Sequence, residues 1–230
     1  MSESNKERAV VLLSGGLDSV VSLARADREM DVRLALFFDY GQRAVDRERE
    51  AALGAVGYFG IPYREIDLRW LGLLAPSGMR KSNQSLEIGG ASELDTLDAV
   101  WVPNRNGVFL NVAAAYAESY GCDVIVAGFN KEEAVEFPDN QAEYVDQVNA
   151  CFRFSTRSDI RVVSFTQDLT KREILLLGVE LGAPLSIIWS CYAGGEMMCG
   201  GCMSCKRLLA AMNSLADDKR PRLRFRLDTE

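Results

Sequence analysis

The chain has 230 residues, 48% of them hydrophobic and 26% charged, which is enough to build one full α/β core. Its net charge of −7 argues against a general nucleic-acid binder, and the absence of histidine excludes Ser-His-Asp and Cys-His catalysis and His-ligated metals. No apolar run approaches the length of a membrane span, and residues 1–8 lack a signal-peptide pattern. We therefore expect a cytoplasmic protein that forms a single domain over residues 1–230.

The first half of the chain alternates between short apolar runs and helix-like segments. The run AVVLL at 9–13 predicts a buried parallel strand, which ends at the glycine pair of SGGLDS. Residues 70–98 are rich in Gly, Ser and Asp and show weak periodicity, so they predict a long loop. The other expected elements are a helix over 19–28, a strand over 32–38, a helix over 45–59 and a strand over 63–68.

The second half repeats this alternation. A plausible N-cap, Thr170, and a stop at Gly182 bound the last predicted helix. Strands that alternate with helices predict a doubly wound, mostly parallel sheet with helices on both faces. The elements expected here are helices over 104–120, 141–152 and 169–181, and strands over 123–129 and 160–165.

Polar clusters follow three of the predicted strands. They are SGGLDS at 14–19, DYGQR at 39–43 and GFN at 128–130. Active sites of doubly wound sheets lie beyond the carboxyl ends of the strands. We therefore expect these three clusters to converge on one edge of the sheet.

The SGGLDS segment has the residues of a phosphate-binding turn. Gly15 and Gly16 let the backbone approach an anion closely, and the N–H groups at the start of the following helix favour negative charge. Ser14 and Ser19 add hydroxyl donors, while Asp18 beside a phosphate indicates a Mg²⁺ ion, which binds carboxylate and phosphate oxygens together. A tight strand–helix turn without a ligand is the alternative. The segment is neither a Walker A loop nor a dinucleotide-binding G-x-G-x-x-G motif.

Four of the six cysteines lie close together near the end of the chain. Cys191, Cys199, Cys202 and Cys205 follow the spacing C-x7-C-x2-C-x2-C. Four thiolates in this pattern suit a closed tetrahedral zinc site, and such a site is structural because no ligand position is left for substrate. We expect one structural zinc per chain, in a segment at about 189–215. An iron–sulfur cluster and free or disulfide-bonded thiols are the alternatives.

The two remaining cysteines, Cys122 and Cys151, stand apart from this cluster, and we expect both to be small buried side chains.

SGGLDS resembles the PP-loop of the N-type ATP pyrophosphatases, an adenylating class in which the substrate attacks the α-phosphate and pyrophosphate leaves. Several further motifs stand between this loop and the cysteines. Together they make the chain resemble the 7-cyano-7-deazaguanine synthase (QueC) family over nearly its whole length. The matching blocks are VVLLSGGLDS at 10–19, FDYGQR at 38–43, VPNRN at 102–106, GFN at 128–130, FPDN at 137–140, LTKREI at 169–174 and WSCYAGGE at 189–196, followed by CGGCMSC.

The resemblance implies a reaction. Members of this family convert 7-carboxy-7-deazaguanine and ammonia to 7-cyano-7-deazaguanine with ATP, through an adenylated carboxylate and then an activated amide. It also implies the adenine nucleotide α-hydrolase (HUP-like) type of fold and a homodimer, with small molecules as partners and neither nucleic acid nor membrane. Such chemistry depends on positioning and charge neutralisation, so a chain without histidine can perform it.

The same resemblance implies roles for particular residues, which fall into three groups. The expected catalytic residues are Asp18, Ser14, Ser19 and Lys171. The expected ATP-binding residues are Leu13, Ser14, Gly15, Gly16, Leu17, Asp18, Ser19, Asp39 and Gln42. The expected substrate-binding residues are Arg43, Arg105, Asn106, Glu133, Phe137 and Asp139. An exposed helix-start lysine is the alternative for Lys171, and a surface ion pair is the alternative for Arg105.

Two places depart from the family pattern. Ala44 stands where the family often has histidine, and the stretch EAVEFPDNQ at 133–141 shares Pro138 and Asp139 with the family but few of their neighbours. These departures touch the acceptor pocket and leave the adenylation chemistry intact. The alternative function is a PP-loop adenylating enzyme that acts on a related carboxylate or on a tRNA base. A third hypothesis is a nucleotide-binding scaffold without catalysis, against which the intact SGGLDS loop argues.

Overall fold

The structure is a computed structural model that describes residues 6–75 and 100–226. Within these residues, one sheet of parallel strands reverses its order between β1 and β4, which confirms the doubly wound fold. The strands lie in the order β3 (Tyr63–Asp67), β2 (Asp31–Asp39), β1 (Arg8–Leu12), β4 (Val124–Ala127) and β5 (Arg161–Ser164).

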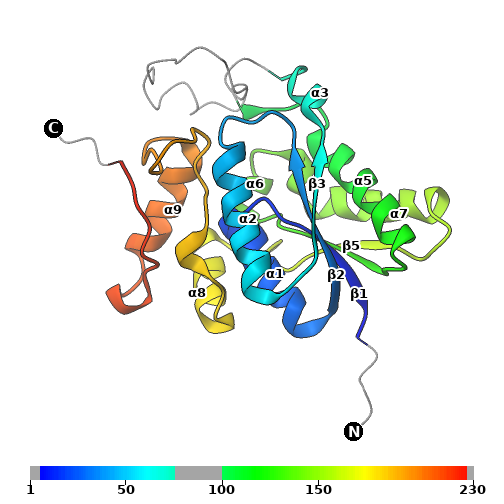
Figure 1. Cartoon of the computed structure of the whole chain (residues 1–230), viewed down its shortest axis with the longest axis horizontal. Coiled ribbons are helices and arrows are strands. Elements are labelled where there is room, and N and C mark those ends of the chain that lie inside the picture. Colours follow the sequence, from blue (N-terminus) through cyan, green and yellow to red (C-terminus); the bar gives the residue numbers. More distant parts are fainter. Residues whose placement is uncertain (1–5, 76–99, 227–230) are drawn as a thin grey trace, which may run out of the picture.

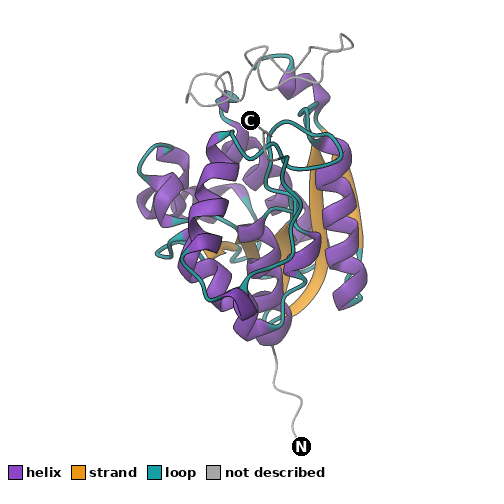
Figure 2. Ribbon diagram, turned by 90° about the vertical axis from the view of Figure 1, so that its left-hand side faces the viewer, coloured by secondary structure: helices purple, strands orange, loops and turns teal. Residues whose placement is uncertain are grey.

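Helices cover both faces of this sheet (Figure 1). The layer on one face holds α1 (Leu17–Glu29), α2 (Val45–Phe59), α8 (Lys171–Leu181) and α9 (Met203–Asn213). Figure 2 looks onto this layer and shows the strands behind it. The opposite face is covered by α5 (Arg105–Ser119) and α7 (Ala142–Ser155). Short pieces connect the layers: α3 (Arg69–Gly72), α6 (Lys131–Ala134), and the 3-10 turns η3 (Pro138–Asn140), η4 (Leu185–Ile187) and η5 (Asp217–Lys219).

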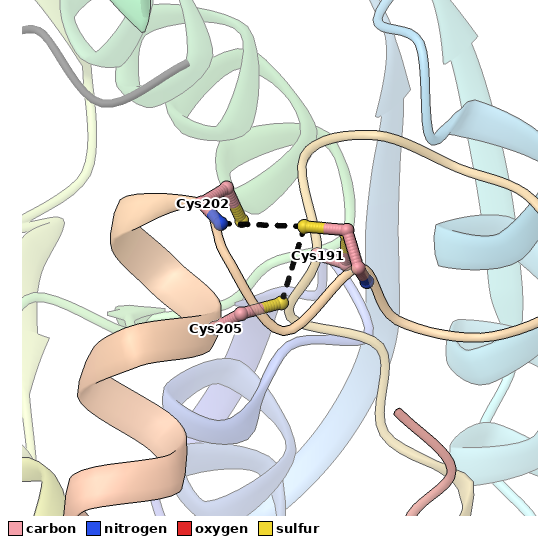
Figure 3. Close-up of side chains that lie close together, drawn as sticks. Cys191, Cys202 and Cys205 are labelled. Atoms are coloured by element: carbon pink, nitrogen blue, oxygen red, sulfur yellow. Dashed lines mark hydrogen bonds between the residues drawn. The ribbon is translucent and has the colours of Figure 1, made fainter. Parts of the chain in front are cut away.

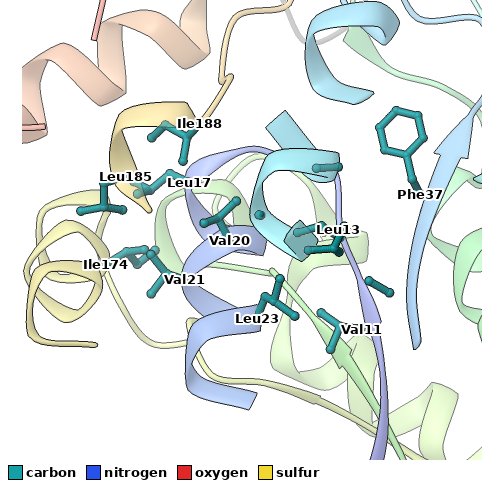
Figure 4. Close-up of a cluster of buried hydrophobic side chains, with 14 of the residues drawn as sticks. Val11, Leu13, Leu17, Val20, Val21, Leu23, Phe37, Ile174, Leu185 and Ile188 are labelled. Carbon is teal, nitrogen blue, oxygen red and sulfur yellow. The ribbon is translucent and has the colours of Figure 1, made fainter. Parts of the chain in front are cut away.

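The alternation of side chains along the strands divides the core into two parts. In β1, Ala9 and Val11 face the layer of α1 and α8, whereas Val10 faces the layer of α5. All three side chains are fully buried, because the strand is covered on both faces. This burial explains why the sequence of β1 is a continuous apolar run. Figure 4 shows the first part of the core, where Val21 of α1 lies near Ile174 of α8.

The regular elements predicted from the sequence are confirmed to within three residues at each end. The helix predicted over 45–59 matches α2 in both bounds, and Gly60 ends it with a left-handed φ of 71°. Thr170 is the N-cap of α8, where its hydroxyl and the side chain of Glu173 form a reciprocal capping box. Gly182 ends α8 as predicted, again in the left-handed conformation.

In the described part of the chain, three α-helices have no counterpart in the sequence predictions. α3 and α6 each span four residues, which is too short for a periodic pattern. The third is α9, which begins directly after Cys202. Of the loop predicted over 70–98, residues 76–99 lie outside the described residues.

The two cysteines that stand apart differ in burial. Cys122 is buried as expected, but Cys151 is exposed, because it lies on the outer side of α7 whereas its neighbour Phe152 packs into the core. Among the described residues, no helix is both long and apolar enough to cross a lipid bilayer.

Candidate active site

A cavity of about 230 Å³ opens at the carboxyl edge of the sheet, where the strand order reverses between β1 and β4. The three polar clusters converge there as predicted, because Ser14, Gln42 and Gly128 all line the cavity. Residues from α5, α8 and the segment after η4 complete its walls. The cavity therefore has the position at which doubly wound sheets bind their ligands.

The SGGLDS loop is shaped by close packing and by its own hydrogen bonds. Gly15 has a left-handed φ of 81°, and a Cβ there would lie 2.6 Å from the carbonyl oxygen of Glu48 in α2. The Ser14 hydroxyl accepts a hydrogen bond from the Gly16 N–H at 3.3 Å and lies 3.1 Å from the Ser19 hydroxyl. Among the residues that the structure describes, no side chain caps α1 at Gly16. The start of α1 can therefore offer its N–H groups and its dipole to an anion.

Lys171 bridges two carboxylates at the wall of this cavity. Its Nζ lies 2.5 Å from Oδ2 of Asp18 and 2.8 Å from Oε1 of Glu133. The residue is only 6% exposed, so it is not an exposed helix-start lysine. Burial acts to lower the pKa of Lys171, but the two carboxylates outweigh burial and hold this pKa above its usual range. The ammonium group of Lys171 therefore remains charged.

The two carboxylates respond differently to this environment. Burial raises the pKa of Asp18. Burial acts in the same direction on Glu133, but the charge and hydrogen bond of Lys171 outweigh it, so the pKa of Glu133 lies below its usual range. Glu133 therefore stays ionised beside Lys171 at neutral pH.

Asn130, the last residue of the GFN cluster, joins this group to the backbone. Its side-chain oxygen accepts hydrogen bonds from the N–H groups of Glu132 and Glu133 at the start of α6, and its amide nitrogen donates to Asp18 at 3.4 Å. The backbone N–H of Lys171 donates to the Glu132 carboxylate at 2.8 Å. The starts of α6 and α8 are thus held together around the Asp18 side chain.

The second carboxylate oxygen of Asp18, Oδ1, is buried and has no hydrogen-bond partner among the described residues. Leaving a buried polar atom unpaired costs about 1–3 kcal/mol. A carboxylate oxygen beside a phosphate-binding turn is the type of ligand that Mg²⁺ prefers. The residues present therefore fit a hard divalent cation at this point.

In the wall of the same cavity, Arg105 lies over the ring of Tyr40. Its guanidinium carbon is 5.7 Å from the ring centroid, and Nη1 is 3.4 Å from the Tyr40 hydroxyl. Asp139 acts on Arg105 through its charge, but no ion pair within the described residues includes Arg105. Among the described residues, Arg105 therefore does not form the surface ion pair that was the alternative prediction for it. An arginine in this setting can bind a carboxylate or a phosphate through paired donors.

A strained turn presents Arg105 and Asn106 to the cavity. The residue before them, Asn104, has a φ of 53°, and it is the one non-glycine residue with a positive φ in the described part of the chain. A Cβ on Gly107 would lie 2.1 Å from the side-chain oxygen of Asn104, so the Asn104 side chain keeps its present position only with glycine there. Strain of this kind costs about 1–3 kcal/mol and is found mainly where function requires it.

A third acidic residue, Glu48, lines the cavity one turn into α2. The amide of Gln42 donates to Oε2 of Glu48 at 2.8 Å and to the carbonyl oxygen of Phe38 at 3.1 Å, while its own oxygen accepts from the Tyr40 N–H. Burial raises the pKa of Glu48 to about 7. This carboxyl group therefore changes its charge near neutral pH.

Most of the residues predicted for the site line the cavity, and four do not. Gly15 packs against α2, and Asp39 is paired with Arg49 of α2 at 3.3 Å. Arg43 and Asp139 are partly exposed outside the cavity wall. The predicted residues that line the cavity are Leu13, Ser14, Gly16, Leu17, Asp18, Ser19, Gln42, Arg105, Asn106, Glu133, Phe137 and Lys171.

The four clustered cysteines form a separate centre. Their sulfur atoms all lie within 4.8 Å of one another, which is close enough to hold a metal ion. Figure 3 shows the sulfurs of Cys191, Cys202 and Cys205 pointing toward one another, Cys202 at the start of α9 and Cys205 within it. The N–H groups of Ala193 and Cys199 donate to the sulfur of Cys191 at 3.3 Å. The predicted cluster of four cysteines is therefore assembled.

The cysteine centre and the cavity share a wall. Ser190, Tyr192 and Ser204, which alternate in sequence with the cysteines, line the cavity. The backbone N–H of Trp189 donates to the carbonyl oxygen of Gly15 at 2.9 Å. The segment that holds the cysteines is thus bonded directly to the SGGLDS loop.

The sequence predictions missed several residues of the site. Tyr40, Asn130, Trp189 and Tyr192 all lie inside blocks that the family resemblance rests on, so position in a block was the available signal. Glu48 had no such signal. It lies in the run DREREAA, where alternating charges suggest a solvated helix face, and only the packing of α2 turns this one side chain inward.

Comparisons with known proteins agree on one family. The model of the family "Queuosine biosynthesis protein QueC" matches residues 8–216. The 7-cyano-7-deazaguanine synthase of Carboxydothermus hydrogenoformans is 50% identical over 210 residues, which cover 89% of this chain and 98% of that protein. The synthase of Pelotomaculum thermopropionicum is 47% identical, with 89% and 96% covered. The synthase of Methanosarcina mazei is 42% identical, with 90% and 94% covered.

Proposed function

The chain belongs to the QueC family of queuosine biosynthesis proteins, and we propose on this basis that it is an ATP-dependent ligase that makes 7-cyano-7-deazaguanine. Its substrates are 7-carboxy-7-deazaguanine and ammonia. ATP adenylates the carboxylate, ammonia converts it to the amide, and a second activation allows the amide to lose water and become the nitrile. The alternative acceptors, a related carboxylate or a tRNA base, are not favoured.

One observation supports this chemistry most directly. The SGGLDS loop, the start of α1 and the buried Lys171 all face one cavity at the switch point of the sheet. An adenylating enzyme must neutralise the charge that builds up as pyrophosphate leaves, and this arrangement supplies donors and a fixed cation for that purpose. Ser14 and Ser19 add hydroxyl donors at the loop.

Magnesium and zinc are assigned to different places. Asp18, with its unpartnered Oδ1, would hold the Mg²⁺ ion that accompanies ATP, and this ion would neutralise the phosphate charge. The four cysteines would hold one zinc ion per chain. A closed set of four thiolates leaves no position for substrate, so the zinc is structural.

Arg105 is the group we assign to the acceptor carboxylate. It faces the cavity, lies over Tyr40 and has no ion pair of its own among the described residues. Phe137 lines the same cavity and offers an apolar surface to the flat ring system. Asn106, Glu133 and Asp139 complete the set proposed for substrate, and Asp39, Gln42 and Arg43 are proposed to support ATP and substrate from the end of β2. We also propose that the enzyme is a cytoplasmic homodimer, which sedimentation would test.

The decisive experiment supplies the protein with ATP, Mg²⁺, ammonia and 7-carboxy-7-deazaguanine and follows the products by mass spectrometry. The expected product is the nitrile, with AMP and pyrophosphate formed alongside it. Formation of AMP without nitrile would mean a different acceptor. The absence of any nucleotide turnover would contradict the proposed function.

Asp18→Asn tests the metal role, because it keeps the size of the side chain and leaves Glu133 paired with Lys171. Adenylation should fall by at least about 100-fold, since the charge that binds Mg²⁺ is lost. Glu29→Gln, at the far end of α1, serves as the matched control. Substantial adenylation by the Asp18 variant would remove this residue from the proposed metal site.

A further inference from the structure

Glu48 is an acidic residue of the cavity that the proposed adenylation does not use. It lies in the first turns of α2, and its backbone carbonyl is the atom that a Cβ on Gly15 would meet at 2.6 Å. The turn of helix that carries the carboxyl group is therefore the same turn that supports the phosphate-binding loop. This places the Glu48 carboxyl group beside the point where the nucleotide is proposed to bind.

The two oxygens of Glu48 are in different situations. Oε2 accepts a hydrogen bond from the Gln42 amide at 2.8 Å, and that amide is itself fixed by Phe38 and Tyr40. Oε1 accepts no hydrogen bond from the described residues, and Glu48 lines the cavity. The carboxyl group is therefore held in one orientation with one oxygen available to a ligand.

The charges around Glu48 distinguish it from the other acids of the cavity. Asp18 and Glu133 are both paired with Lys171. The charged groups that act on Glu48 are Arg105 from α5 and Asp39 from the end of β2, and neither forms an ion pair with it among the described residues. Glu48 is therefore a cavity carboxylate that has no cation of its own.

We propose that Glu48 binds the ammonium ion and removes the proton that blocks its attack on the activated carboxylate. This inference rests on the proposed amide-forming function. Ammonium is a compact cation that needs an acceptor oxygen and a proton acceptor at the same point, and Oε1 supplies both. Arg105, which we assign to the carboxylate of the acceptor, faces the same cavity. Nitrogen and carboxyl carbon would thus be brought together by oppositely charged side chains.

The proton balance is simple. The ammonium ion transfers one proton to Glu48, which leaves neutral ammonia and a protonated carboxyl group. The nitrogen lone pair then forms the C–N bond, and the C–O bond to AMP breaks with its electron pair going to AMP. The nitrogen loses one further proton to solvent, and Glu48 later returns its own proton to solvent. A side chain whose pKa lies at about 7 is suited to this exchange.

The ring system of the acceptor is a less suitable partner for Glu48. The guanine-like edge carries two adjacent N–H donors, which match a carboxylate that offers both oxygens side by side. In Glu48 one oxygen already accepts from Gln42. A single available oxygen fits a small cation better than a two-point base edge.

The test uses Glu48→Gln in the full-length, metal-replete enzyme. Glutamine keeps the size of the side chain, and its oxygen can still accept the hydrogen bond from Gln42. Glu50→Gln is the matched control, because Glu50 lies on the same helix with its side chain 66% exposed. Pyrophosphate–ATP exchange driven by 7-carboxy-7-deazaguanine without ammonia measures adenylation alone. Amide formation is then measured with ammonium and with hydroxylamine, a nucleophile that is largely unprotonated at neutral pH.

The expected result is a split between these measurements. In the Glu48 variant the exchange rate should stay within about 3-fold of the wild type, while kcat/KM for ammonium falls about 100-fold or more. Hydroxylamine should remain a good nucleophile, because it needs no proton removed before attack. The rise of kcat/KM for ammonium with pH, centred near the Glu48 pKa of about 7, should move in the variant to higher pH, toward the pKa of ammonium itself.

Three results would overturn the proposal. Equal losses with ammonium and hydroxylamine would mean that Glu48 has only a structural role. A raised KM for the carboxylic acid with unchanged use of ammonium would mean that Glu48 binds the ring system instead. An absence of exchange in the wild-type enzyme would contradict the proposed function itself, and the assignment of Glu48 with it.

Discussion

Lys171 is the cation that balances the charges of two neighbouring carboxylates. It is 6% exposed and contacts two carboxylates that come from segments far apart in sequence, Asp18 and Glu133. A buried ion pair is not by itself stabilising, because taking the charges out of water costs about as much as their attraction returns. Removing only the cation is different, since it leaves two carboxylates facing each other without compensation.

Lys171→Met should therefore damage both stability and activity. We expect the free energy of unfolding to fall by about 3–5 kcal/mol, the usual cost of breaking a buried pair, and adenylation to be lost. Denaturant unfolding and pyrophosphate exchange measure these two effects. Lys131→Met, at an exposed position of α6, is the control and should change neither one appreciably. Wild-type stability in the Lys171 variant would contradict the charge balance described above.

Glu48 leads to a prediction about pH. Burial raises its folded-state pKa to about 7 from a usual value near 4.5, so between these pH values the folded protein binds more protons than the unfolded chain. Stability linked to this residue is therefore complete at low pH and decreases as pH rises through about 7. Glu48→Gln cannot ionise, so it should unfold at a higher denaturant concentration than wild type at pH 8. The difference should reach up to about 3 kcal/mol at pH 8 and vanish below the usual pKa of 4.5, where both states are protonated.

The single residues also show how far sequence can be interpreted. Asp18, Arg105 and the four cysteines stand in motifs whose residue types point to a chemistry, and the structure brings these motifs to the cavity and the cysteine centre. Glu48 stands among alternating charges, and its inward orientation depends on the packing of α2 against the SGGLDS loop. Such a contact between distant segments leaves no local pattern.

At the level of elements, the junction between β1 and α1 depends on close packing against α2. Gly15 has a φ of 81°, and its Cα lies so near α2 that a Cβ would be 2.6 Å from one backbone oxygen and 2.8 Å from the Ala51 methyl group. Because both obstacles belong to the helix itself, neither can move aside without shifting α2. The shape of the SGGLDS loop and the position of α2 are therefore linked.

Gly15→Ala should disturb both the shape of the SGGLDS loop and the position of α2. We expect a loss of about 1–3 kcal/mol in the free energy of unfolding from backbone strain, and ATP binding weakened by about 10-fold or more in calorimetry. Gly57→Ala is the matched control within α2, because a Cβ there meets no atom within 4 Å. That variant should gain about 0.5–1 kcal/mol from the better helix propensity of alanine. Normal ATP affinity in the Gly15 variant would contradict the linkage.

Whether the sequence predicted an element depended on the length of the element and on recognisable residues at its ends. α2 and α8 have a full periodic pattern and recognisable ends, such as the Thr170 cap and the two terminal glycines Gly60 and Gly182. α6 is only one turn long and depends on its Asn130 N-cap and on α8, where the backbone N–H of Lys171 donates to the Glu132 carboxylate. α9 starts within the cysteine run, where the spacing of the cysteines is interpreted as a metal-binding pattern and the start of a helix is not recognised.

At the scale of the whole molecule, the cysteine segment is part of the wall of the cavity. Ser190, Tyr192 and Ser204 line the cavity, and Arg207 of α9 is paired with Glu136 beside α6 at 2.5 Å. The segment thus touches the SGGLDS loop on one side and the proposed acceptor pocket on the other. A metal that is structural in its coordination would still influence catalysis through this wall.

Removal of the metal tests this connection. Treatment with a chelator under reducing conditions should lower Tm by several degrees and should also weaken binding of ATP, because α9 and the segment before it lose their common anchor. Cys205→Ser should reproduce both effects, whereas Cys151→Ser, at an exposed position of α7, should have none. A metal-free protein with unchanged Tm and unchanged ATP affinity would contradict this prediction.

Trp189 stands where these parts of the molecule meet. Its N–H is bonded to Gly15, its indole N–H donates to the carbonyl oxygen of Cys191 at 2.9 Å, and the guanidinium of Arg47 lies 5.7 Å from its ring. The indole of Trp189 is therefore an intrinsic fluorescent probe. The other two tryptophans, Trp70 and Trp101, would be replaced by phenylalanine. The fluorescence emission of Trp189 would then respond to nucleotide binding at the SGGLDS loop and to loss of metal from the cysteines, in real time and without a label.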